Sequence, residues 1–210
     1  MDSNTENRRK AVLAGHSGDY ESANSLLTDD DPKVRGAALS SLEKLEMLSG
    51  EILEKSVCDS SPEVRKRAVE LLAKRPEEIP LDILNDEDYL VVETACWAIG
   101  EKENPSLDLI NKLCLIADSH EEQLCREAAV AALGSIGSPL GLDSVLAALN
   151  DKPAIRRRAA IALAAFEDPK VDEALKKSLD DRDWQVRQIA EDLLDVNRVI
   201  SPVDIGPRPG

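Results

Sequence analysis

The sequence predicts an all-α fold, a right-handed α-α superhelix of about six helix-pair repeats, and three observations lead to this fold class. The chain repeats itself with a period of about thirty residues, most clearly from Asp29, Asp59, Asn150 and Asp181. The second half of each copy carries apolar residues at helical spacing. A turn that contains Asp, and often Pro, comes before that half. Stacked helix pairs of this kind bury a continuous core between neighbouring repeats.

Two columns of residues set the register of the repeats. Weaker copies from Asp86 and His120 fill the gap between the clear ones. The first column is arginine, at Arg35, Arg65, Arg126, Arg156 and Arg187, with Val92 in the third copy. Six positions earlier lies a mostly acidic column: Asp29, Asp59, Asp86, His120, Asn150 and Asp181.

The elements follow in order from these columns. A helix over Glu6–Ala14 and the turn after it form an N-terminal cap at residues 1–18, and the repeats occupy residues 19–197. In the second repeat we expect a first helix over Gly50–Cys58 and a second over Glu63–Lys74. Residues 198–210 are rich in Pro and Gly, which predicts an extended tail.

The second helices carry the apolar stripe. In the second repeat this stripe is Val64, Ala68, Leu71 and Leu72, spaced to lie on one side of a helix. An alanine recurs in every copy, at Ala38, Ala68, Ala95, Ala129, Ala159 and Ala190. A small side chain there lets neighbouring helices approach closely, and a larger one would push the layers apart.

The turns predict a structural ladder rather than a catalytic site. Asp or Asn at the start of a turn accepts hydrogen bonds from turn amides, and Pro32, Pro62 and Pro153 suit the first position of a helix. We assign the ladder to Asp29, Arg35, Asp59, Arg65, Arg126, Arg156, Asp181 and Arg187. Because Val92 lacks a guanidinium and His120 and Asn150 lack a carboxylate, we expect the middle copies to be looser.

The pattern D-x-x-P-x-V-R-x-x-A-x-x-L, with linkers such as Gly134–Gly137, resembles the HEAT-like repeat of the phycocyanobilin-lyase type. The resemblance covers Asp19 to Val196, nearly the whole chain. It implies a helix-pair solenoid whose second helices line the concave face. It implies little about function, because such repeats occur in lyase subunits, deoxyhypusine hydroxylase, scaffolds and chaperones.

Composition argues against nucleic-acid binding, membrane insertion and secretion. The formal charge of −15 argues against general binding to a phosphate backbone, although Arg65–Arg67 and Arg156–Arg158 are local basic clusters at equivalent places. No apolar run is long enough for a membrane span, and the polar N-terminus lacks the apolar core of a secretion signal. The four cysteines lack metal or redox spacing, so we expect buried free thiols and a cytoplasmic protein.

No catalytic constellation stands out. The resemblance to deoxyhypusine hydroxylase would imply a di-iron site built from several His-Glu pairs, but the chain contains only His16 and His120. Arg126 stands before Glu127 where such a pair would have its histidine. Phosphate loops, dinucleotide-binding turns and nucleophile elbows have no match in the sequence. We therefore assign no catalytic residue, no metal ligand and no cofactor.

A partner-binding surface is expected on the concave face of the solenoid, formed by the outward side of the second helices. The residues assigned to it are Trp97, Ile161, Glu93, Glu127, Arg157, Glu70, Gln188 and Asp192. Trp97 and Ile161 are apolar among mostly polar neighbours. Trp97 is open to two interpretations: an anchor in a binding groove, or a side chain that fills a packing gap in the irregular third repeat.

The function expected from these features is a non-catalytic protein–protein interaction module, such as a scaffold, adaptor or assembly factor. The net charge suggests an acidic groove that would suit a basic or amphipathic protein segment. A lyase-like or chaperone subunit that acts on a chromophore-bearing protein is the alternative. An atypical nucleic-acid binder is the third possibility.

Overall fold

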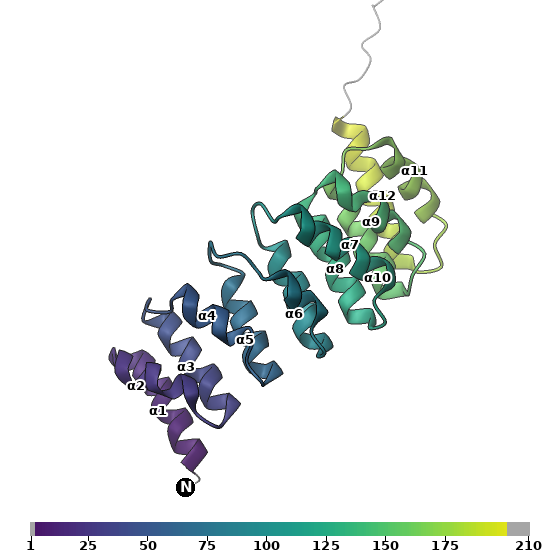
Figure 1. Ribbon diagram of the computed structural model, residues 1–210. Coiled ribbons are helices and arrows are strands. Elements are labelled where there is room, and N and C mark those ends of the chain that lie inside the picture. Colours follow the sequence, from purple (N-terminus) through teal and green to yellow (C-terminus); the bar gives the residue numbers. More distant parts are fainter. Residues whose placement is uncertain (1–2, 201–210) are drawn as a thin grey trace, which may run out of the picture. The chain divides into compact units, whose positions relative to one another are not determined.

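A computed structural model describes residues 3–200, with side chains described for residues 4–195. Every regular element in that range is a helix, so the all-α repeat fold predicted from the sequence is confirmed (Figure 1). The chain divides into two compact units, Met1–Lys112 and Leu113–Gly210, here called unit 1 and unit 2. Each unit is a stack of helix pairs.

Unit 1 begins with α1 (Ser3–Ser17), which packs against the second helix of the first repeat. That repeat consists of α2 (Tyr20–Ser25), a short 3-10 helix (Leu26–Thr28) and α3 (Pro32–Lys44). The second repeat pairs α4 (Gly50–Ser56) with α5 (Pro62–Leu72). In the third, a 3-10 helix (Leu81–Asn85) replaces the first helix and precedes α6 (Tyr89–Gly100). The helix α7 (Leu107–Ser119) begins in unit 1 and ends in unit 2.

Unit 2 continues with α8 (Gln123–Ile136), the second helix of the fourth repeat. A 3-10 helix (Pro139–Gly141) leads into α9 (Leu142–Ala148), which pairs with α10 (Pro153–Ala162). Another 3-10 helix (Leu163–Ala165) leads into α11 (Pro169–Ser178), and α12 (Trp184–Ile200) is the last second helix. Within unit 2, α10 packs between α8 and α12.

The core lies between neighbouring second helices, as the apolar stripe predicts. All six alanines of the column are completely buried: Ala38, Ala68, Ala95, Ala129, Ala159 and Ala190. The packing is tightest at Gly134 of α8, where an added Cβ would lie 2.6 Å from the Cβ of Ala162. Real carbon atoms do not approach so closely, so this site accepts only glycine without a shift of α8 or α10.

The starts of the second helices follow the predicted turn chemistry. Pro32, Pro62 and Pro153 are each the first residue of their helix, where an amide hydrogen would have no helical partner. Asp31 and Asp88 accept hydrogen bonds from backbone amides of the first turns of α3 and α6. Local sequence therefore sets where these helices begin.

Several boundaries differ from the expectation: α1 begins at Ser3 rather than Glu6, and α4 and α5 each end two residues before the expected end. The N-terminal helix continues past Ala14 to Ser17 and ends at Gly18, whose φ of 79° suits glycine. His16 therefore lies in a helix rather than in a turn. The backbone of α12 continues to residue 200, beyond the expected start of the tail at 198. The remainder of that tail, residues 201–210, lies outside the described residues.

None of the helices within residues 3–200 combines the length and the apolar content that a crossing of the membrane requires.

Candidate functional site

The ladder in the turns joins one repeat to the next. Arg35 on α3 donates through Nε and Nη2 to the Asp59 carboxylate of the following repeat, at 2.9 and 2.6 Å. Its Nη1 donates to the backbone carbonyl of Asp29 in its own repeat, at 2.8 Å. The carboxylate pairs thus lie between repeats, whereas the contact within a repeat is made by a carbonyl.

The same arrangement recurs one repeat later in unit 1. Arg65 donates to both carboxylate oxygens of Asp86 at 2.7 Å and to the carbonyl of Asp59 at 2.9 Å. The side chains of Arg65 and Asp86 are only 10% and 7% exposed, so this pair is the most buried of the ladder. The Asp86 carboxylate also accepts the Asp88 amide, which closes the turn as predicted.

Unit 2 has its own rungs, and one of them corrects the expectation. Arg126 donates to the carboxylate of Asp151 at 2.7 Å, one residue beyond the Asn150 assigned from the sequence. Arg156 then pairs with Asp181 at 2.8 Å. Because Asp151 supplies the carboxylate that Asn150 lacks, the fifth repeat is tied like the clear copies. Arg187 ends the ladder on the Asp181 carbonyl at 2.7 Å.

The third repeat lacks the ladder arginine, and the fourth lacks the acidic residue at the start of its turn, as the sequence indicated. Val92 is buried, and its side chain has no polar group that could take the place of the guanidinium. His120 provides its backbone carbonyl to Arg126 at 2.7 Å, and its ring Nδ1 accepts the Glu122 amide at 3.1 Å. The imidazole therefore performs the turn-closing task that Asp performs elsewhere. This role matches the turn position expected for His120.

The ladder perturbs the ionisation of its members. Burial, the largest single influence, would raise the pKa of the Asp59 and Asp86 carboxyls. The arginine hydrogen bond, the turn-amide hydrogen bond and the arginine charge together outweigh burial and lower both pKa values. For Asp151 and Asp181 the hydrogen bond from the paired arginine is the main cause of a lowered pKa. Each carboxylate stays charged and fully paired, which suits a structural role.

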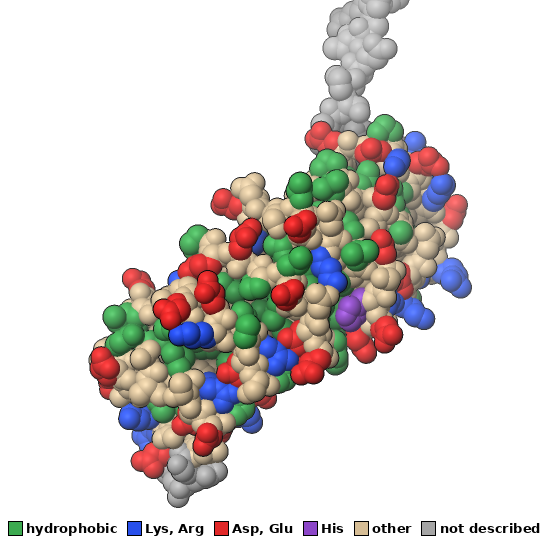
Figure 2. Space-filling model, in the orientation of Figure 1, with side chains coloured by type: hydrophobic (Ala, Val, Ile, Leu, Met, Phe, Trp, Pro, Cys, Tyr) green, Lys and Arg blue, Asp and Glu red, His purple; other side chains and the backbone are tan. Residues whose placement is uncertain are grey.

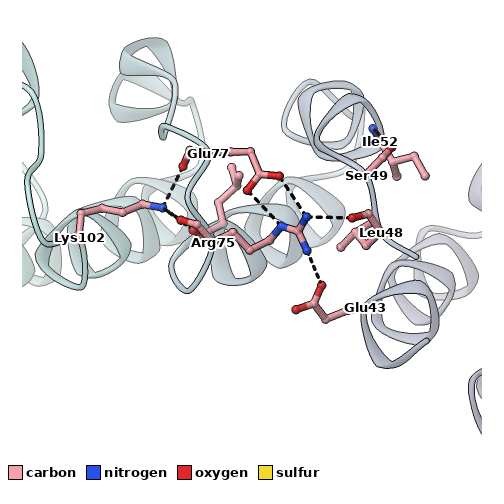
Figure 3. Close-up of polar contacts among 8 residues, drawn as sticks. Glu43, Leu48, Ser49, Ile52, Arg75, Glu77 and Lys102 are labelled. Atoms are coloured by element: carbon pink, nitrogen blue, oxygen red, sulfur yellow. Dashed lines mark hydrogen bonds and ion pairs between the residues drawn. The ribbon is translucent and has the colours of Figure 1, made fainter. Parts of the chain in front are cut away.

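A second polar cluster closes the loop after α5 (Figure 3). Arg75 donates to Glu43 and Glu77 at 3.0 Å and to the Leu48 carbonyl at 2.9 Å. Lys102 donates to three backbone carbonyls, those of Leu72, Arg75 and Glu77, at 2.6, 2.6 and 2.9 Å. Burial lowers the pKa of the Lys102 amine, and nearby Glu77 opposes that shift. Because carbonyls occupy all three donors of Lys102, we interpret this cluster as a clasp on the C-terminal end of α5.

The outward side of the second helices in unit 1 is hollowed. Three of the residues assigned to the partner surface, Glu70, Glu93 and Trp97, line one hollow of about 580 Å³ between α3, α5 and α6. A second hollow of about 470 Å³ lies between α1, α3 and α5. Arg67 lines both, so we treat them as one feature, the unit 1 groove.

Trp97 belongs to this groove and is not a buried gap filler. Its side chain is 41% exposed, whereas its neighbours Ala95, Cys96 and Ala98 are completely buried. The floor beside it is held in place by Arg67, which donates to Ser40 on α3 and to Glu70 on its own helix. The groove therefore combines an exposed aromatic side chain with polar side chains that are hydrogen-bonded to one another.

In unit 2, the assigned residues lie on the corresponding helices, largely tied to one another or to neighbours. Glu127 lies 3.6 Å from Arg158, and Arg157 forms an ion pair with Asp183 at 3.3 Å. Gln188 donates to Asp192 at 3.0 Å along α12. Ile161 is 51% exposed. Figure 2 shows acidic, basic and hydrophobic side chains intermixed across the face in view.

The four cysteines differ in how exposed they are. Cys96 and Cys125 are buried and lie outside any disulfide, whereas Cys114 is half-buried and Cys58 is exposed in the turn after α4. Among the described residues, no group of three or more His, Cys, Asp or Glu is placed to hold a metal ion.

Comparison with known proteins fits this architecture. A sequence profile of HEAT repeats matches residues 77–154 and 110–195, which together span more than half of the chain. The chain belongs to the HEAT repeat family. A profile of HEAT repeats associated with sister chromatid cohesion matches residues 51–72. No curated protein matches the sequence.

Solved structures show the same HEAT-type fold at low identity. YibA of E. coli is 18% identical over 94% of this chain and 76% of its own, with a TM-score of 0.63. An engineered protein is 20% identical over 86% of this chain and 58% of its own, with a TM-score of 0.60. Human deoxyhypusine hydroxylase is 21% identical over 94% of this chain and 81% of its own, with a TM-score of 0.49. For YibA and the engineered protein, the likeness at these identities concerns the fold alone.

Proposed function

We propose that this HEAT repeat protein is a non-catalytic interaction module that binds a segment of a partner protein on the outward side of its second helices. The observation that supports the proposal most strongly is the exposed Trp97 in a preformed groove with a fixed polar floor. Exposed aromatic side chains in grooves supply much of the affinity of protein interfaces, because they bury a large apolar area at little entropic cost.

The proposal extends to the other residues assigned to the partner surface. Glu70 and Glu93 lie beside Trp97 in unit 1, and Glu127, Arg157, Ile161, Gln188 and Asp192 are the candidates in unit 2. Within the HEAT family we place these repeats with the phycocyanobilin-lyase type on their D-x-x-P-x-V-R motif. This placement concerns the repeat pattern and assigns no pigment chemistry. A cytoplasmic location is part of the proposal, and it is supported by cysteines that form no disulfide within residues 4–195.

Capture from a lysate of the native host tests the proposal. We expect the wild-type chain to retain a partner that Trp97→Ala loses, with mass spectrometry as the readout. Trp184→Ala is the matched control, because Trp184 is 64% exposed and does not line the unit 1 groove. Circular dichroism should show that both variants are folded. If all three chains retained the same proteins, the groove would not be the binding site.

A further inference from the structure

We propose that the unit 1 groove selects an acidic, amphipathic peptide segment, with an apolar side chain against Trp97 and carboxylates over the basic part of the groove. This inference rests on the proposed function and names the chemistry of the partner. It reverses the expectation drawn from the net charge of the chain. The acidic surplus of unit 1 lies outside the groove.

The hollow between α1, α3 and α5 is basic. Its charged lining consists of one acid, Glu63, and four cations, Arg8, Lys33, Lys44 and Arg67. Lys44 lies against the ring of His16, with Nζ 2.8 Å from Nδ1. Apart from Arg67, these cations form no ion pair with any described residue. They are therefore available to a ligand.

The hollow at Trp97 also contains more unpaired basic than acidic side chains. Its cations Lys66 and Lys74 form no ion pair within residues 4–195. Of its three acids, Glu70 is paired with Arg67 and Glu43 with Arg75, which leaves only Glu93. Across the whole groove, the charged residues without an ion pair to a described residue are five basic ones and two acidic ones: Arg8, Lys33, Lys44, Lys66 and Lys74 against Glu63 and Glu93.

This excess of positive charge in the groove contrasts with the net negative charge of residues 1–112. Residues 1–112 contain 24 Asp and Glu against 14 Lys and Arg. Many of the acids are in the repeat turns, where Asp59 and Asp86 are already paired with arginines of the ladder. Positive charge concentrated in a hollow of an acidic protein attracts anions to that hollow and away from the rest of the surface.

The groove also contains apolar surface, which favours a peptide over a bare anion. Val12 is 46% exposed and lines the basic hollow together with Pro32 and Ala37, and Trp97 lines the other. A peptide with acidic and apolar residues would satisfy both kinds of lining at once. A nucleic acid would satisfy the cations but leave Val12 and its apolar neighbours uncovered.

Fluorescence of Trp97 in the full chain tests the inference. Trp184→Phe leaves Trp97 as the sole tryptophan, because the chain has only two. The probes are three short synthetic peptides with identical leucine positions and with glutamate, glutamine or lysine at the positions between them. A thymidine oligonucleotide of similar length provides an anion that is not a peptide.

We expect the glutamate peptide to shift Trp97 fluorescence at the lowest concentration and to weaken as salt is added. Lys33→Glu/Lys74→Glu should lower its affinity by about tenfold, the size that two solvent-exposed ion pairs give. Lys152→Glu/Lys176→Glu is the matched control, because it changes the total charge equally with exposed lysines in unit 2. The affinity of this control for the glutamate peptide should stay within about twofold of that of the parent chain.

The other outcomes would overturn the inference in distinguishable ways. If the lysine or glutamine peptide bound as tightly as the glutamate peptide, the acidic preference would be wrong while the groove remained a peptide site. Equal binding by the oligonucleotide would show that the groove recognises anions without regard to the peptide. If no probe moved Trp97 fluorescence, the inference would fail, and lysate capture by wild type but not by Trp97→Ala would still support the proposed function.

Discussion

At the scale of single residues, the arginine ladder does the most to tie one repeat to the next. Every ladder guanidinium except that of Arg187 donates to a carbonyl of its own turn and to a carboxylate of the next turn, so one side chain fixes two loops. The recurring arginines were evident in the sequence, but Asp86 and Asp151 were not assigned to the ladder, and the carboxylate that each arginine contacts was not predicted. Spacing along the chain cannot tell whether a long side chain reaches back to its own turn or across to the neighbouring one.

Removal of Arg65 should be strongly destabilising. Arg65→Met keeps the packing of the aliphatic stem but leaves the Asp86 carboxylate buried without its cation, which we expect to cost about 3 kcal/mol of unfolding free energy. Arg182→Met is the control, because Arg182 is exposed, and its effect should stay within about 0.5 kcal/mol. Urea unfolding followed by circular dichroism measures both. A loss below about 1 kcal/mol for Arg65→Met would contradict the structural role.

The ladder also predicts how stability depends on pH. The folded pKa values of Asp59, Asp86, Asp151 and Asp181 lie below the unfolded value of about 3.9. Their stabilisation is complete above that value and is lost as the pH falls through the folded pKa values, since the unfolded chain binds protons first. Urea midpoints between neutral and acidic pH should fall accordingly. Asp86→Asn should flatten this dependence, and an unchanged slope would refute the link.

At the scale of helices, the close approach of α8 and α10 depends on Gly134. Gly134→Ala would place a Cβ 2.9 Å from the Cα of Ala162, so one helix must move. We expect a loss of about 1–3 kcal/mol, although alanine is the better helix former. Gly36→Ala in α3 is the matched control, because nothing lies within 4 Å of its added Cβ. Gly36→Ala should stabilise the fold by about 0.5–1 kcal/mol. Thermal unfolding should therefore show a lower Tm for Gly134→Ala and a higher Tm for Gly36→Ala, and a raised Tm for both would contradict the close packing at Gly134.

The clasp on α5 gives a second prediction at this scale. Lys102→Met removes the cation that contacts the last carbonyl of α5 and two carbonyls of the loop after it, so we expect a loss of about 1–2 kcal/mol of unfolding free energy. Hydrogen exchange should rise first in the loop over residues 73–79. Lys112→Met tests whether any nearby lysine would give the same result. Equal exchange in the two variants would show that the clasp contributes nothing.

At the scale of the whole chain, the sequence predicted the repeat pattern well, because the alanine column and the Asp–Pro turns repeat a local rule. It predicted the groove less well. The net charge suggested an acidic surface, yet the groove cations come from α1, α3 and α5, which only the fold brings together. A signal was present in α3, where Lys33, Gly36, Ser40 and Lys44 share one side of the helix.

The central claim is that a partner binds on the outward side of the second helices of unit 1, and photo-crosslinking tests it most directly. A photoreactive p-benzoylphenylalanine would replace Lys74, which is exposed in the groove, or Glu54, which is exposed on the first helix α4. After irradiation in lysate of the native host, we predict a crosslink from position 74 to one partner segment that contains acidic and apolar residues, and none from position 54. The same crosslink from both positions, or from position 54 alone, would contradict the claim.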